Sequence, residues 1–353
     1  MIMDKIRVLI ADKSSVYTKM FTRAVTETDN KISVSCVTDG DEVLGLINSK
    51  SYDIIVIDAE ISKPGLIELV NIILMKNPLV YVLVIARPSA ANKDLFMDAL
   101  SKGATECMTK PINDSYAENF DAVKRKMNYL IKKTMRKIRE ENVASPDAVP
   151  VSTMKTPNVN TFNPEIVLIA ASTGGPLALN NILPNLQKDF PVPILIVQHI
   201  PSYFTETLAQ HLDKKSKLNV KIAQDRETIK AGTVYLAPGG LHMKLNSKNN
   251  IRLDDSPPIG GLRPAADILF ESVAKSFSGT RVLVVILTGM GSDGKRGLVS
   301  LKAKRDCYCI TQSEDTCVVY GMPRCAVESG LADKILDLDK IYCELESLCY
   351  IQT

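Results

Sequence analysis

Three short apolar runs in the C-terminal half of the chain each end at a turn that carries a polar side chain. The runs are residues 166–169, 193–197 and 282–287. Unbroken apolar runs of this length, stopped by glycine or polar residues, are typical of parallel strands buried on both faces. The carboxyl ends of such strands line the ligand crevice of an α/β fold. We therefore expect Ser172, His199 and Asp293, which follow these runs, to meet at one edge of one sheet.

Ser172 lies in the turn Ala-Ala-Ser-Thr-Gly-Gly-Pro, where a strand ends and a helix should begin. The small residues permit a sharp bend that exposes the hydroxyl, and they leave backbone N–H groups directed at the space above it. The pattern Ala-x-Ser-x-Gly is close to the nucleophile-elbow motif without being identical to it. Taken alone, this turn is equally suited to a nucleophile and to a phosphate site.

The chain has only three histidines, and their settings differ. His199 stands at the end of an apolar strand, next to Ile-Pro. His211 falls in an amphipathic helical pattern and is expected to be a surface or packing residue. His242, in the segment LHMKL, could line the site. Asp293 falls at the expected start of a helix, so its alternative role is that of an N-cap.

These groups together favour acyl transfer. Ser172 would attack an acyl carbon, His199 would take its proton, and Asp293 would orient the imidazole and stabilise its cation. Backbone N–H groups near Thr173 and Met290 are candidates for an oxyanion hole. The order Ser, His, Asp differs from that of the α/β-hydrolases, so we do not expect that fold.

Bulk properties limit the partners and the compartment. The net charge of +3 predicts no strong attraction to nucleic acid or to a membrane surface. No apolar stretch approaches the ~18 residues of a membrane span, and an acidic residue precedes the first apolar run, so we expect no membrane insertion and no signal peptide. The eight cysteines lack metal-ligand spacing, which is typical of reduced thiols in a cytoplasmic protein.

The N-terminal part of the chain alternates between strand and helix patterns. The five strand patterns are residues 6–11, 32–37, 53–58, 80–86 and 105–108. Amphipathic segments such as 66–76 and 93–102 separate them, which predicts a five-stranded doubly wound parallel sheet. A basic amphipathic helix follows over 121–141, and no aromatic interleaving favours a nucleic-acid patch on it. Residues 142–163 are rich in Pro, Ser, Thr and Asn and are typical of a linker.

Six segments of the second half form an ordered series: IAASTGGP, VQHIP, YLAPGGLHM, SPPIGGLRPAADILFESVA, VILTGMGSDG and CVVYGMPRCAVESG. In kind and order they resemble the chemotaxis protein-glutamate methylesterases, the CheB-type response regulators. The resemblance covers nearly the whole chain. It implies an α/β protein of two doubly wound parallel-sheet domains, a flavodoxin-like receiver and a Rossmann-like esterase domain. The expected parts are the receiver at 4–130, a helix end and linker at 131–163, and the catalytic domain at 164–353.

The same resemblance implies an activity: hydrolysis of glutamate γ-methyl esters on chemoreceptors to glutamate and methanol, and, in many members, deamidation of receptor glutamines. Ser172, His199 and Asp293 fall on the family's triad, and Thr173 and Met290 on positions that shape its site. No metal or organic cofactor is implied for the esterase half. At residue 170 the chain has Ala where the family usually has Gly, and we expect the extra methyl group to be tolerated.

In the receiver, the resemblance places Asp58 on the phosphoacceptor, with a chemotaxis histidine kinase as its phosphodonor. Lys110 falls on the invariant cation, and Asp12 on the first acidic residue that would hold Mg²⁺ together with Asp58. Two positions differ from the family: Lys13 replaces a second acidic metal ligand, and Ala86 replaces a Ser/Thr hydroxyl. A lysine adds positive charge where a dication must bind, so we expect weak Mg²⁺ binding and weak or absent phosphorylation, unless the ammonium partly replaces the metal.

Two other functions stay open at this point. An inactive regulator would bind receptors without hydrolysing them, which the intact Ser172, His199 and Asp293 disfavour. A nucleotide-binding module would use the Ser-Thr-Gly-Gly turn, which the lack of a Gly-x-Gly-x-x-Gly or Walker lysine disfavours. Protection by nucleotide in a thermal-shift assay would distinguish the second of these. A receiver that cannot be phosphorylated would leave the enzyme constitutively active, constitutively damped, or switched by a partner.

Overall fold

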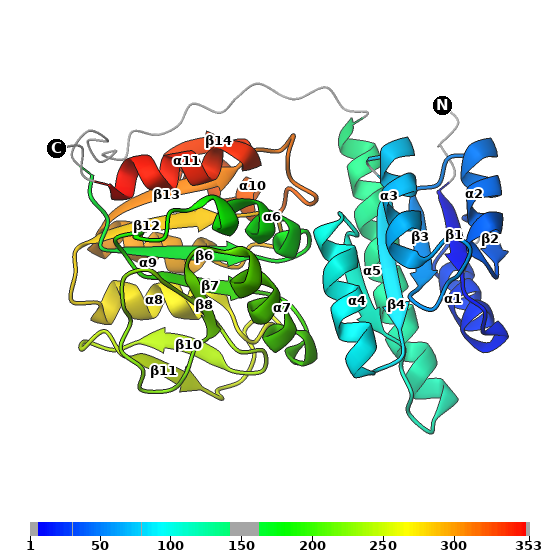
Figure 1. Cartoon of the computed structure of the whole chain (residues 1–353), viewed down its shortest axis with the longest axis horizontal. Helices are drawn as coiled ribbons and strands as arrows, with labels where there is room; N and C mark the ends of the chain where they lie inside the picture. The colour runs from blue at the N-terminus through cyan, green and yellow to red at the C-terminus, as the bar shows by residue number, and fades with distance from the viewer. Residues whose placement is uncertain (1–5, 30, 79, 142–161, 351–353) are drawn as a thin grey trace. The chain divides into compact units, whose positions relative to one another are not determined.

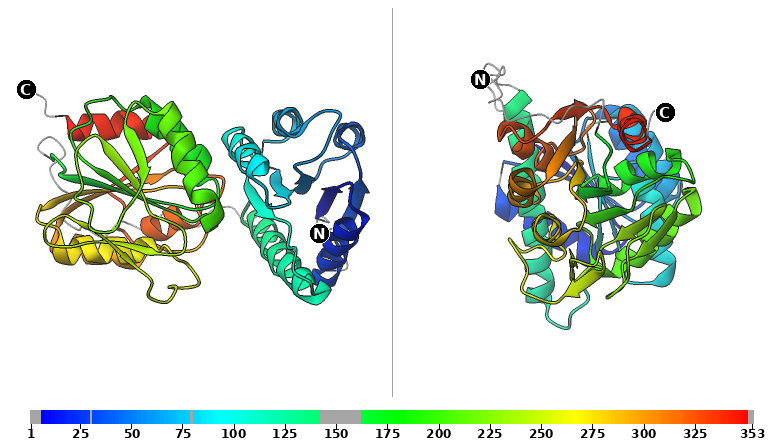
Figure 2. Two further views of the ribbon diagram at one scale, coloured as in Figure 1. Left: turned by 60° about the horizontal axis from the view of Figure 1, so that its bottom comes forward. Right: turned by 90° about the vertical axis from the view of Figure 1, so that its left-hand side faces the viewer.

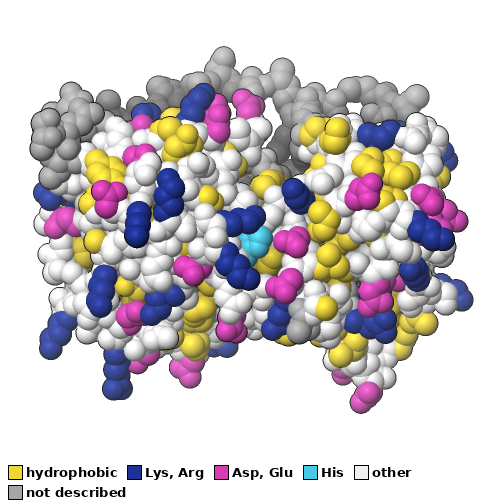
Figure 3. Space-filling view, viewed as in Figure 1, with side chains coloured by type: hydrophobic (Ala, Val, Ile, Leu, Met, Phe, Trp, Pro, Cys, Tyr) yellow, Lys and Arg dark blue, Asp and Glu magenta, His cyan; other side chains and the backbone are white. Residues whose placement is uncertain are grey.

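The computed structural model describes residues 6–29, 31–78, 80–141 and 162–350. Contacts divide the chain into two units, residues 1–148 and 149–353. The predicted linker, 142–163, lies almost entirely outside the described residues. No described helix combines the length and the apolar character that crossing a bilayer requires. On the face displayed in Figure 3, acidic and basic side chains are interspersed, as a net charge of +3 leads one to expect.

The N-terminal unit is a five-stranded parallel sheet with the order β2-β1-β3-β4-β5 (Figure 1). Its strands are β1 (Arg7–Ala11), β2 (Ser33–Val37), β3 (Ile54–Asp58), β4 (Tyr81–Ala86) and β5 (Glu106–Thr109). Its helices are α1 (Ser15–Thr28), α2 (Gly40–Ser49), α3 (Leu66–Lys76), α4 (Ala90–Ser101) and α5 (Tyr116–Glu141). This strand order confirms the predicted flavodoxin-like doubly wound sheet. The basic helix begins earlier than the expected residue 121.

One core of this unit lies between the sheet and the helices α1 and α5. Alternate residues of the strands, among them Val8, Ile10, Val56 and Leu83, contact apolar side chains of the two helices. Each such side chain removed from water contributes about 1.5–3 kcal/mol of transfer free energy. The carboxyl ends of β1, β3 and β5 therefore have fixed positions relative to one another.

The C-terminal unit has a seven-stranded sheet with the order β14-β13-β12-β6-β7-β9-β8, and every adjacent pair is parallel. Its strands are β6 (Ile166–Ala171), β7 (Ile194–Gln198), β8 (Asn219–Ile222), β9 (Thr233–Leu236), β12 (Arg281–Ile286), β13 (Asp306–Gln312) and β14 (Lys334–Leu336). The chain runs from β6 outward to β8 and β9, then returns to place β12 on the other side of β6. A topological switch point therefore lies beside β6, as in doubly wound α/β folds.

Helices cover both faces of this sheet, as Figures 1 and 2 show. One side has α6 (Gly175–Ile182), the short 3₁₀ helix η2 (Leu183–Asn185), α7 (Ser202–Lys215) and α11 (Leu338–Cys349). The other has α8 (Ala266–Ser276), α9 (Lys295–Lys304), α10 (Met322–Glu328) and the antiparallel hairpin β10 (His242–Leu245) and β11 (Ile251–Asp254). The sequence did not predict this hairpin. The two-layer cover explains why β6, β7 and β12 read as unbroken apolar runs.

Candidate active site

Ser172 lies one residue beyond β6, in the turn that leads into α6. Its backbone N–H donates to the carbonyl of Thr288, 3.1 Å away, in the loop after β12. Gly174 caps α6 with φ of 81°, a left-handed conformation that glycine adopts without strain. Gly289 packs against Ser172 so closely that a Cβ added there would lie 2.8 Å from the serine Cβ. The strand end therefore presents the serine at the switch point.

His199 occupies the matching position beyond β7. Ala171 and Gln198 are paired in the parallel ladder, and the His199 backbone N–H donates to the Ala171 carbonyl at 3.0 Å. The imidazole is largely buried, with 9% of its side chain exposed. The predicted meeting of the serine and histidine strand ends is confirmed.

Asp293 lies in the loop between β12 and α9 and completes the cluster. Its Oδ2 lies 2.8 Å from His199 Nε2, and its side chain is 6% exposed. Asp293 also accepts the backbone N–H groups of Ala266 (2.6 Å) and Asp267 (2.9 Å) at the start of α8. The N-cap alternative is thus partly right: the carboxylate receives helix N-terminal amides, but from α8, whereas Gly294 caps α9.

Burial by itself would raise the pKa of Asp293. The hydrogen bond from His199 and those from the Asp267 and Ala266 amides outweigh burial, and the pKa of Asp293 is lowered from its ordinary value. The carboxylate is therefore ionised at neutral pH and can only accept hydrogen bonds. It follows that His199 carries its proton on Nε2, which leaves the lone pair on Nδ1.

The predicted oxyanion residues lie in the two loops that follow β6 and β12. Thr173 is buried, and its carbonyl accepts the Thr288 hydroxyl at 3.0 Å. Met290, in the loop after β12, is 41% exposed. Within the part of the chain that the structure describes, the backbone N–H groups of Thr173 and Met290 make no hydrogen bond, and none joins the hydroxyl of Ser172 to His199. Such bonds are often loose before substrate binds.

The other two histidines lie elsewhere. His211 is on α7, as expected. His242 is fully buried and does not line the site: its Nδ1 accepts the Ala265 N–H at 3.2 Å, and its Nε2 lies 3.3 Å from the Pro257 carbonyl. It thereby holds the chain just before α8. Ala170 is buried inside β6, where extended backbone accommodates its methyl group.

Sequence reasoning gave no role to Gln198, the buried residue that ends β7. Its amide contacts the backbone of both Ser172 and His199. It also missed the α8 amides that hold Asp293. The only signal for Gln198 was its position: it is a polar residue at the end of an apolar strand, directly before a candidate base. Nothing in the sequence marked the α8 amides.

The predicted receiver residues also converge. Lys110 Nζ lies 2.8 Å from an oxygen of Asp12 and 2.8 Å from an oxygen of Asp58, and all three side chains are at most 5% exposed. Burial raises the pKa of Asp12, against the lowering effect of Lys110 and of the Ser14 amide. Ala86 is buried at the end of β4 and offers no hydroxyl.

The carboxylate oxygens of this cluster already have close partners other than a metal. Mg²⁺ requires near-octahedral oxygen ligands. One oxygen of Asp12 and one of Asp58 face Lys110, while the others accept backbone N–H groups at 2.8 Å and 3.2 Å. Lys13 brings a second ammonium group, which donates to Ser62 Oγ at 2.9 Å. Among the described residues, no three or more His, Cys, Asp or Glu side chains form a metal-binding group.

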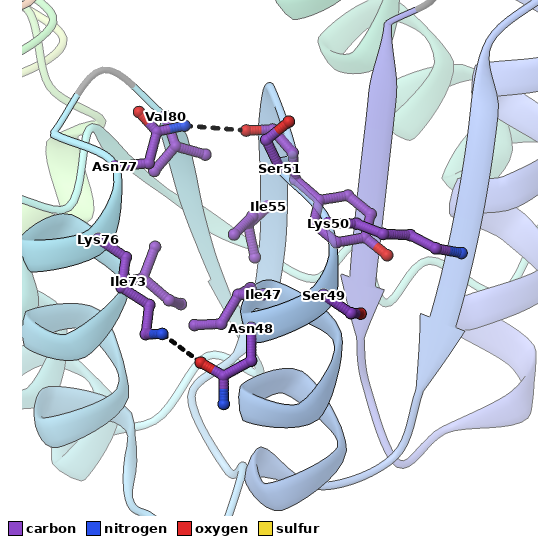
Figure 4. A pocket seen from close by; sticks show the side chains of 11 residues that line it. Ile47, Asn48, Ser49, Lys50, Ser51, Ile55, Ile73, Lys76, Asn77 and Val80 are labelled. Atoms are coloured by element: carbon purple, nitrogen blue, oxygen red, sulfur yellow. Dashed lines mark hydrogen bonds between the residues drawn. The ribbon is translucent and has the colours of Figure 1, made fainter.

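A pocket of about 280 Å³ lies between α2 and α3, near the amino-terminal end of β3 (Figure 4). Asp58 ends the same strand at its opposite end. Among the lining side chains, Lys76 contacts Asn48 across the pocket. The pocket is therefore separate from the carboxylate cluster of its own unit.

Comparison with known proteins agrees with this geometry. Residues 167–345 match the CheB methylesterase family, and residues 8–119 match the response regulator receiver domain. The protein-glutamate methylesterase/protein-glutamine glutaminase of Halalkalibacterium halodurans is 34% identical over 98% of this chain and 99% of its own. A second protein of that name, numbered 2, from Caulobacter vibrioides is 37% identical over 95% of this chain and 96% of its own.

Among solved structures, the Thermotoga maritima CheB methylesterase catalytic domain matches with 43% identity and a TM-score of 0.51. The match covers 53% of this chain and 99% of that one. The matched segments, the two parallel sheets and the residues gathered at the ends of β6, β7 and β12 agree with one another. This chain belongs to the CheB methylesterase family and joins a receiver domain to the esterase domain.

Proposed function

We propose that this protein hydrolyses glutamate γ-methyl esters on chemoreceptors, releasing methanol and leaving glutamate. The observation that carries the proposal is the 2.8 Å hydrogen bond between His199 Nε2 and Asp293 Oδ2, made beside Ser172 at adjacent strand ends. A serine, a histidine and an ionised carboxylate so arranged are the parts of a nucleophilic triad. The relatives named as methylesterases over nearly the full chain support the substrate class.

The reaction then proceeds in two halves. Ser172 Oγ attacks the ester carbon while His199 Nδ1 takes its proton, and the imidazolium passes that proton to the departing methoxide. Water attacks the resulting acyl-serine, His199 takes a proton from it, and glutamate leaves as Ser172 regains its hydrogen. Asp293 holds the Nε2 proton throughout. The N–H groups of Thr173 and Met290 receive the negative oxygen of each tetrahedral intermediate.

The same serine chemistry extends to receptor glutamines, whose side-chain amide would release ammonia in place of methanol. The combined name of the relatives, methylesterase and glutaminase, favours this second activity. All eight cysteines are free thiols, which supports a reducing compartment, so we place the reaction in the cytoplasm.

The full chain is expected to release methanol from methylated receptor membranes, and a small-molecule phosphodonor should change that rate by less than about twofold. The reason is the poor fit of the receiver cluster to Mg²⁺. Without bound Mg²⁺, the kinase or another phosphodonor cannot efficiently phosphorylate Asp58. Gas chromatography of released methanol provides the measurement. A chain that releases none would contradict the proposed function, whereas a rate that rises with phosphodonor would show a working receiver despite Lys13 and Ala86.

Lys13→Asp is expected to raise the affinity of the receiver for Mg²⁺ by about tenfold or more. The change replaces a positive by a negative charge, and each unit pair at about 4 Å contributes about 1 kcal/mol even in water. Isothermal titration calorimetry with MgCl₂ measures the affinity. Lys50→Asp, the same change at an exposed site beyond α2, is the control and should match the wild type. Wild-type binding as tight as that of Lys13→Asp, or stable phospho-Asp58 in the wild type at physiological Mg²⁺, would overturn this view.

A further inference from the structure

Within the described part of the chain, Gln198 is the one side chain that bonds to the backbone of both the nucleophile and the base. It ends β7 and is 2% exposed. Its Nε2 donates to the Ser172 carbonyl at 2.8 Å and to the His199 carbonyl at 3.0 Å. Both partners are carbonyl oxygens, which only accept, so the amide must present its NH₂ group to them. The orientation of the side chain is therefore fixed by its neighbours.

The place of these bonds in the sheet explains their effect. Up to Ala171 and Gln198, the spacing of β6 and β7 is set by the parallel backbone ladder. Beyond that pair the two chains diverge, since Ser172 turns into α6 and His199 leads toward α7. There, one backbone bond still ties His199 to the end of β6, from its N–H to the Ala171 carbonyl, whereas the Ser172 N–H bonds to Thr288 in the loop after β12. The two N–H groups of Gln198 supply one bond to each diverging segment.

The neighbouring chain leaves room for this side chain only because residue 175 is glycine. A Cβ added at Gly175 would lie 1.9 Å from Gln198 Oε1 and 2.8 Å from its Cδ. Oε1 itself is buried with no hydrogen-bond partner among the described residues. An unpaired buried oxygen costs roughly 1–3 kcal/mol. The amide therefore directs its NH₂ group at the two strand ends and its oxygen at Gly175.

We propose that Gln198 is a positioning residue for ester hydrolysis, fixing the separation of Ser172 and His199 by bonding to both of their carbonyls. This inference rests on the proposed function. Loss of the two bonds lets the two turns move apart, and a displacement of about 1 Å at reacting groups lowers rates by about 100-fold. The residue touches neither substrate nor the reacting atoms, so substrate binding should be preserved.

The test compares Gln198→Met, which keeps the length of the side chain but removes both donors, with the wild-type full chain. We expect kcat for methanol release to fall about 10- to 100-fold, with KM within about twofold. A covalent phosphonate ester that labels the serine directly should react more slowly by the same factor. The pH at which the rate is half-maximal should not move, because His199 and Asp293 keep their mutual contact.

A second variant reaches the same bonds without altering Gln198. Gly175→Ala forces Oε1 aside and should reproduce the loss in kcat and in labelling rate. Thr311→Val, which removes a buried hydroxyl from β13, is the control for lost stability and should keep kcat within about twofold of the wild type.

The outcomes separate the two proposals. Wild-type chain that labels at Ser172 but releases no methanol would contradict the proposed substrate, while the labelling rates would still test Gln198. Gln198→Met with wild-type kcat and labelling rate overturns the positioning role and leaves the esterase function intact. Losses no larger than those of Thr311→Val, or a change confined to KM, overturn it as well.

Discussion

Ser172→Ala is expected to lower the rate of methanol release from methylated receptors by about 10⁴-fold or more. The hydroxyl is the only atom group removed, and without it no acyl-enzyme can form, since water must attack the ester unaided by a covalent step. Residual acceleration would come only from binding and from the amides of Thr173 and Met290. The measurement is the initial rate of methanol release, with enzyme in the range where wild-type release is linear.

The control for this variant is Ser300→Ala, which makes the same chemical change on α9 and should release methanol at the wild-type rate. Circular dichroism should show the same fold for both variants, because Ser172 is joined to its neighbours through its backbone. A Ser172→Ala protein that keeps a rate within tenfold of the wild type would exclude the serine as nucleophile.

Asp293→Asn is expected to reduce kcat by about 10⁴-fold, although the new side chain has nearly the same shape. In the wild type, Asp293 Oδ1 accepts the N–H groups of both Asp267 and Gly294, so the asparagine oxygen should take that position. Its NH₂ group would then face His199 Nε2 and force the ring proton onto Nδ1. The nitrogen that should take the serine proton would already carry one. Initial rates of methanol release, compared with those of the exposed-site variant Asp306→Asn, measure the loss.

The same substitution should show a signature in stability. The pKa of Asp293 is lowered in the folded state, so the ionised carboxylate stabilises the fold above the ordinary Asp pKa of about 3.9. That contribution is lost as pH falls through the lower folded value. The difference in unfolding free energy between wild type and Asp293→Asn should therefore shrink below about pH 4 in urea titrations. A wild-type rate in this variant, or a difference independent of pH, would contradict the role of the carboxylate.

The positions of the reactive groups followed from the sequence because parallel strands place their carboxyl ends together. That single rule predicted the meeting of Ser172, His199 and Asp293, whereas Asp12 and Asp58 were placed by the resemblance to the receiver family. The end of each strand could also be predicted, because a glycine or a polar residue follows each apolar run. The five-stranded sheet followed from the alternation of strand and helix patterns, whereas the switch point beside β6 follows from the observed strand order.

Contacts that depend on tertiary packing could not be predicted from the sequence. From its neighbours in the sequence, Asp293 was a candidate N-cap of α9. In the structure it accepts backbone N–H groups from α8, a helix that precedes it in the chain. His242 belongs to a short antiparallel hairpin that the sequence pattern did not predict, and it is buried away from the site. In the sequence, Gln198 looks like any polar residue that ends a strand. Only its hydrogen bonds to the carbonyls of Ser172 and His199 in the folded protein distinguish it.

The strand order of the catalytic unit also has a consequence for folding during synthesis. β6 pairs on one side with β7, which follows it closely, and on the other with β12, which is made much later. His199 and its carboxylate partner are 94 residues apart in the chain. Parallel pairings between such distant segments form late in folding, after long loops have closed. A chain still leaving the ribosome therefore has its serine and histidine without the carboxylate that orients the imidazole, and we expect hydrolysis to begin only with the finished sheet.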